Sequence, residues 1–127
     1  MPDQERAMLS YAQLAALSQQ KGQLPSRDKF LILAAASGCR AGWPVVAERC
    51  RELVLSHNPA YLIGHSSTFV EAMRSPDFEY FLKQLERFCS YEKAEHLLAE
   101  LDIDIRTPKA DGSRTAGEIA HSLLNAE

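Results

Sequence analysis

The sequence is poor in the residues that favour β-strands. Its 127 residues include four valines, five isoleucines and three threonines, against 17 alanines and 16 leucines, which favour helices. It also lacks a long hydrophobic run, since the longest, Phe30 to Ala36, is far below the roughly 20 residues that cross a bilayer. We therefore expect an all-α, soluble protein with no membrane partner, forming one domain over residues 1–127.

Paired cysteines and an excess of basic residues are missing too. Cys39, Cys50 and Cys89 are odd in number and form no Cys-x-x-Cys pair, which argues against a disulfide framework and against a zinc site. The net charge of −3, with basic residues dispersed among acids, argues against a nucleic-acid partner. Residues 1–5 have no apolar segment of signal-peptide length. We expect a cytoplasmic protein without metal or cofactor.

Start and stop signals divide the chain into six to seven helices. The helix after Phe78 has the strongest apolar stripe, which predicts a core-facing side that includes Phe88. Residues 105–114 are polar and rich in turn formers, and predict a surface linker. Thr115 and Glu118 then have the spacing of a capping box, which predicts a C-terminal helix over 115–125. The other predicted first residues or caps are Asp3, Ser26, Pro44, Ser67, Ser75 and Ser90.

Two stretches, residues 28–59 and 75–104, share a helix, turn, helix pattern. Each has a turn residue and a small residue where two helices would cross; these are Gly42 and Ala47 in the first, with Pro59 closing it, and Tyr91 and Ala94 in the second. In these positions the chain resembles the tetratricopeptide family of helical-hairpin repeats. The resemblance implies a short solenoid of packed antiparallel hairpins, with a binding groove lined by the first helix of each.

The resemblance is partial. Arg51 stands where the family places a large apolar residue, and Arg106 stands where the second closing proline would be. Ala47 and Ala94 are separated by more than the family's period of about 34 residues. An irregular bundle of antiparallel hairpins is therefore the alternative fold.

One face of the helix after Pro76 carries a regular series of charges. Glu79, Lys83 and Arg87 repeat every four residues, and we predict that they form a surface for a protein or peptide partner. The same spacing also stabilises an exposed helix without any partner. Because the sequence shows no catalytic constellation, we expect a small interaction or scaffold module and not an enzyme.

A second hypothesis is a regulatory or accessory domain that binds a small ligand or anion. Its site would lie near Tyr61, His65, Ser66 and Ser67, since hydroxyl groups before a helix N-terminus can hold an anion. Ser66 or Ser67 could equally serve as an ordinary helix cap. A third hypothesis is a homo-oligomer that exchanges the apolar stripe of residues 119–124 between copies. No histidine and carboxylate are spaced to suggest a catalytic pair.

Overall fold

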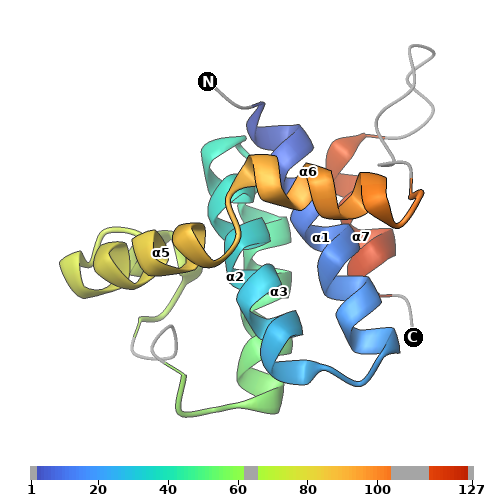
Figure 1. Ribbon diagram of the computed structural model, residues 1–127. Coiled ribbons are helices and arrows are strands. Elements are labelled where there is room, and N and C mark those ends of the chain that lie inside the picture. The colour runs from blue at the N-terminus through green and yellow to red at the C-terminus, as the bar shows by residue number, and fades with distance from the viewer. Residues whose placement is uncertain (1–2, 62–65, 104–114, 126–127) are drawn as a thin grey trace.

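The computed structural model describes residues 3–61, 66–103 and 115–125, and over these ranges the chain forms helices and no strand (Figure 1). The all-α prediction is confirmed. None of the helices in these ranges is both long enough and apolar enough to span a membrane. The predicted linker 105–114 lies outside the described residues. The helices are α1 (Gln4–Gln20), α2 (Leu24–Arg40), α3 (Pro44–His57), α4 (Phe69–Ala72), α5 (Pro76–Phe88), α6 (Tyr91–Glu100) and α7 (Ala116–Leu124).

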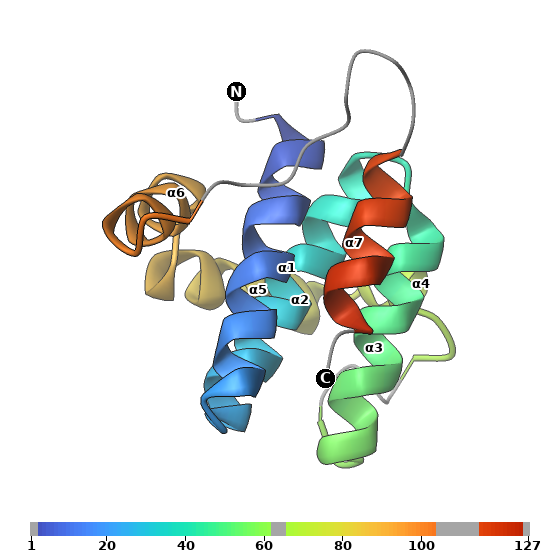
Figure 2. The same cartoon turned by 90° about the vertical axis from the view of Figure 1, so that its right-hand side faces the viewer.

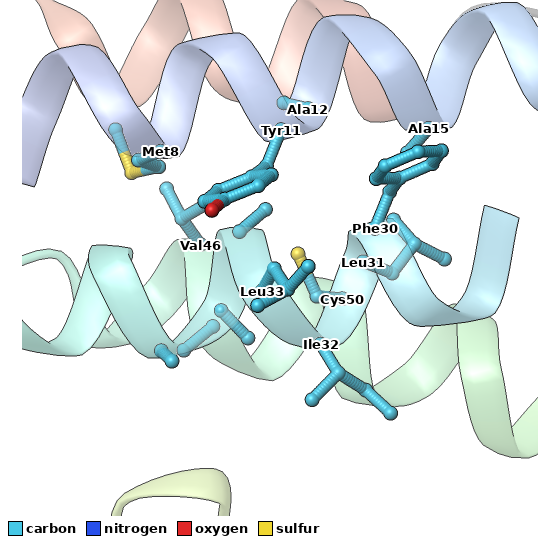
Figure 3. Packing of buried hydrophobic residues seen from close by; sticks show 14 of the residues in the cluster. Met8, Tyr11, Ala12, Ala15, Phe30, Leu31, Ile32, Leu33, Val46 and Cys50 are labelled. Atoms are coloured by element: carbon cyan, nitrogen blue, oxygen red, sulfur yellow. The ribbon is translucent and has the colours of Figure 1, made fainter. Parts of the chain in front are cut away.

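Helix α2 is the centre of the fold. Residues 30–38 are all buried, and α2 packs on α1, on α3 and on α5. Ala34, Ala35 and Ala36 are at most 1% exposed, and their small side chains let the neighbouring helices approach closely. Figure 3 shows Met8 and Tyr11 of α1 directed toward the core that α2 and α3 share. Helix α2 is therefore covered by α1, α3 and α5.

Local signals set most helix ends. The Asp3 carboxylate accepts from the backbone N–H groups of Glu5 and Arg6 at the start of α1. Thr115 and Glu118 form the predicted capping box of α7. Proline occupies the first turn of α2, α3 and α5, where its missing N–H has no helical acceptor.

Two predicted caps are wrong. Helix α2 begins at Leu24, before the expected cap Ser26, because Pro25 fits within the first helical turn and does not have to precede it. Helix α4 is capped by the hydroxyl of Thr68, which accepts from the Glu71 N–H at 3.0 Å, and not by Ser67. The Ser67 hydroxyl bonds to the Glu71 side chain.

Helices α5 and α6 do not form the expected second hairpin. They follow one another nearly end to end (Figure 1), so that α5 packs on α2 while α6 packs on α1. The backbone at the junction, Cys89, is extended and does not reverse the chain. The Tyr11 hydroxyl donates to the Cys89 carbonyl at 2.8 Å and attaches the junction to α1. Arg6 of α1 also pairs with Glu95 of α6.

Helix α7 packs on α1 and α3 of its own chain (Figure 2). Gly117 lies against the ring of Trp43, and a Cβ atom at this glycine would come within 2.6 Å of two ring carbons. The Trp43 indole N–H donates to Glu5 at 2.8 Å, which fixes the ring. The docking of α7 therefore depends on the absence of a side chain at residue 117. Exchange of α7 between copies stays a prediction.

We predict that Gly117→Ala lowers the free energy of unfolding by about 1–3 kcal/mol, because the new methyl group overlaps a ring that cannot move freely. Urea unfolding followed by circular dichroism measures the change. The matched control is Gly38→Ala, whose Cβ would meet the flexible Met8 sulfur at 3.3 Å, and whose helical position gains from alanine. An equal or smaller loss for Gly117→Ala would contradict this account.

Candidate functional site

The charged series on α5 lies on the solvent side of that helix. Glu79, Lys83 and Arg87 are all exposed, opposite the buried Phe78 and Leu82. Lys83 Nζ lies 3.5 Å from Glu79 Oε1, with both side chains about two-thirds exposed. Arg87 has no ion pair or hydrogen bond among the residues that the structure describes. The predicted residues therefore share one surface, and Arg87 is its unpaired cation.

Two aromatic residues extend this surface. Tyr80 is 68% exposed and Phe88 is 39% exposed. Tyr80, Gln84 and Phe88 are spaced four residues apart, so their side chains lie on successive turns along one side of the helix. We call the residues Tyr80, Lys83, Gln84, Arg87 and Phe88 the α5 outer face.

The sequence analysis missed Tyr80 and assigned Phe88 to the core. Tyr80 lies two residues from the buried Phe78, about 200° around the helix, so the helical period alone could have placed it outside. Phe88 is the last residue of α5, where burial ends: its ring packs on Phe30 with centroids 5.8 Å apart, and the residue remains 39% exposed.

The alternative ligand site is not assembled by the residues described. Tyr61 is half-buried and packs edge-to-face on Phe81, with ring centroids 5.9 Å apart. The Ser66 carbonyl accepts from Arg51 Nη2 at 2.7 Å, and the Ser67 hydroxyl bonds to Glu71. The Ser67 hydroxyl thus has a partner within the chain, whereas the contact of Ser66 uses its backbone carbonyl. His65 lies outside the described residues.

A buried charged cluster joins the start of α2 to the end of α3. Asp28 is 2% exposed, and Arg27 donates to its Oδ1 from Nη2 at 3.0 Å and from Nε at 3.3 Å. His57 Nδ1 lies 2.6 Å from the other carboxylate oxygen, Oδ2. Arg27 also donates to the Leu53 carbonyl at 3.2 Å and to the Gln19 side chain at 3.1 Å. The spacing of residues in the sequence did not indicate this contact between a histidine and a carboxylate.

Sequence separation hid this pair. Asp28 and His57 are 29 residues apart, and only the antiparallel turn between α2 and α3 brings the first turn of one helix beside the last turn of the other. The available signal was a charged pair, Arg27 and Asp28, at the edge of an otherwise apolar helix. Buried ions require partners, so a cation or donor from a neighbouring helix was to be expected.

The contact with Asp28 fixes the orientation of the His57 imidazole. The contact with Asp28 occupies Nδ1, so the other ring nitrogen, Nε2, lies on the far side of a ring that is 35% exposed. No group of three metal-ligating side chains forms within the described ranges. Cys50 of the same helix is buried, and burial raises the pKa of its thiol to about 12. The contacts of Arg27, Asp28 and His57 therefore join the start of α2 to the end of α3.

A cavity of about 50 Å³ lies where α1, α2, α5 and α6 meet. It has room for one or two water molecules and not for a metabolite. Burial raises the pKa of Tyr91 to about 12 and that of Tyr11 above its usual range, so both phenols keep their protons at neutral pH. The polar side chains that line it belong to Gln4, Tyr11, Ser37, Arg40, Glu86 and Tyr91.

Comparison of the chain with protein-family models, with curated proteins and with solved structures finds no match. The tetratricopeptide resemblance stays a prediction.

We predict that Asp28→Ala lowers the free energy of unfolding by about 3–5 kcal/mol, because the Arg27 guanidinium would stay buried without its carboxylate. Urea unfolding measures it. The matched control is Asp77→Ala, an exposed first-turn acid of α5, which should cost about 0.3–1 kcal/mol. Equal losses in the two variants would show that the cluster contributes no more than a surface charge.

We also predict that the three thiols react slowly in the folded protein. Burial raises the pKa of Cys39 to about 11 and of Cys50 to about 12, and it raises that of Cys89 as well. At about pH 8 the thiolate population of Cys39 is then more than about a hundredfold below that of a free cysteine. Titration with a disulfide reagent should modify all three only after unfolding in urea. Rapid modification of one thiol in the folded protein would contradict the prediction.

Proposed function

We propose that this protein is a small interaction module that binds a protein or peptide partner through the α5 outer face. The observation that carries the proposal is Tyr80, which is 68% exposed. It lies about two turns before Arg87 on the same side of α5, and Arg87 has no partner among the described residues. Tyrosine and arginine contribute most to binding when a partner covers them, because each combines a large apolar surface with a polar end.

The buried residues of α5 hold the α5 outer face in a fixed position, which favours binding of a partner. Phe78, Leu82 and Leu85 are at most 5% exposed on the opposite side of α5. The Phe78 ring packs edge-to-face on Phe69 of α4, with centroids 5.4 Å apart. A helix held in this way loses little conformational freedom when a partner binds its outer side.

A small-molecule function has less support among the described residues. The cavity between α1, α2, α5 and α6 has space for water only. The raised thiol pKa values leave Cys39 and Cys50 as poor nucleophiles. Cys39, Cys50 and Cys89 are free thiols, which supports our expectation of a reducing, cytoplasmic location.

The experiment is a selection of a displayed random-peptide library on the immobilised, folded protein. We predict that the selected peptides bind Tyr80→Ala and Arg87→Ala at least about tenfold more weakly than the parent, because the partner then loses its main contacts. Fluorescence anisotropy with the synthesised peptides measures the affinities. Thermal unfolding should show little change, since both side chains are exposed.

Val45→Ser is the matched control, because Val45 is 67% exposed on α3 and its replacement removes a similar apolar group from another surface. Peptides that bind all variants equally, or a library that yields no binder, would overturn the proposed function.

A further inference from the structure

We infer that the segment recognised by the α5 outer face is acidic and carries a hydrophobic side chain that packs on Phe88. This inference rests on the proposed function and specifies its partner class. Its basis is an exposed aromatic ring surrounded by cations at the C-terminal end of α5.

The Phe88 ring is the anchor of this end of the face. One side of it packs on Phe30, and the ring remains 39% exposed. Lys29 of α2 places its Nζ 4.6 Å from the ring centroid. The exposed part of this ring therefore offers an apolar contact beside a positive charge.

Two further cations lie at the same helix end. Lys93 of α6 donates from Nζ to the Phe88 carbonyl at 3.2 Å, where the last carbonyls of α5 favour a positive charge. Arg87 precedes Phe88 and has no partner in the described part of the chain. An unpaired guanidinium is suited to bind a carboxylate through two parallel hydrogen bonds.

The neighbouring acids do not neutralise this end. Glu86 is turned toward α2, with its Oε1 3.7 Å from Arg40. Glu92 precedes Lys93 in the sequence, and this one acid leaves the three cations Lys29, Arg87 and Lys93 in excess. Glu79 pairs with Lys83, two turns earlier.

The chain as a whole has a net charge of −3, so this excess of positive charge is local. Its complement is a segment that presents carboxylates to Arg87, Lys29 and Lys93 and a hydrophobic side chain to Phe88. Contacts between exposed charges steer association and weaken with salt, because the screening length falls to about 8 Å at physiological ionic strength.

The test uses the same peptide selection and reads the composition of the bound peptides. We predict that aspartate and glutamate are enriched around a hydrophobic residue relative to the unselected library. Affinity should fall by about tenfold or more in Arg87→Glu and also as salt rises. Lys21→Glu changes the net charge equally in the exposed turn after α1 and should alter affinity by less than about twofold.

The outcomes separate this inference from the proposed function. Neutral or basic peptides that still require Tyr80 would overturn the acidic partner and leave the interaction module standing. Peptides indifferent to both Tyr80 and Arg87 would overturn both. Sedimentation of the protein alone tests a second copy as the occupant, and flotation with phosphatidylserine vesicles tests a membrane. Self-association or vesicle binding abolished by Arg87→Glu would overturn the peptide partner.

Discussion

The burial of α2 on every side is the constraint on which the other elements depend. Leu31, Ile32 and Leu33 are each at most 2% exposed, and burial of side chains of this size contributes about 2 kcal/mol each. A helix that is apolar all round cannot remain at a surface, so α1, α3 and α5 must cover it. The small side chains of Ala34, Ala35 and Ala36 determine how closely these neighbouring helices approach α2. Helices α6 and α7 are then placed indirectly, since both pack on α1.

The charged cluster at the start of α2 gives this arrangement its register. An apolar helix surrounded by apolar neighbours can slide or rotate with little change in contacts, whereas Asp28 must meet His57 and Arg27 must meet the Leu53 carbonyl, both on α3. A buried ion pair adds little to stability compared with apolar residues, but leaving one partner unpaired costs much. The cluster therefore acts against wrong registers of α2 and α3, which explains why charged residues lie at 2% and 8% exposure beside a hydrophobic core.

Local chemistry made most of the fold predictable, and long-range pairing limited the rest. The capping box at Thr115, the proline at the start of α5 and the cap Ser90 act within one helical turn, so the sequence displays them directly. The direction of the chain at Cys89 depends on Tyr11, 78 residues earlier, and the partner of Asp28 lies on another helix. For the candidate site, Glu79, Lys83 and Arg87 follow from helical spacing. The exposure of Phe88 does not follow from helical spacing, because it depends on how much of the ring the packing of α5 on α2 covers.

The α5 outer face exists because, within the described residues, α5 buries the side that carries Phe78, Leu82 and Leu85 and leaves the side of Tyr80 exposed. Helices α1 and α2 have neighbours on several sides, whereas α5 projects from the core and packs on α2 (Figure 1). Phe78, Leu82 and Leu85 supply the buried side of α5. The stability of the fold therefore does not depend on the Tyr80 side chain. The exposed Tyr80 ring contributes little to folding. Arg87, about two turns further along the same side, has no ion pair or hydrogen bond with the described residues. The exposed side of α5 is not needed for packing, and its buried side holds the helix in place. Such a surface can bind a partner with little loss of conformational freedom.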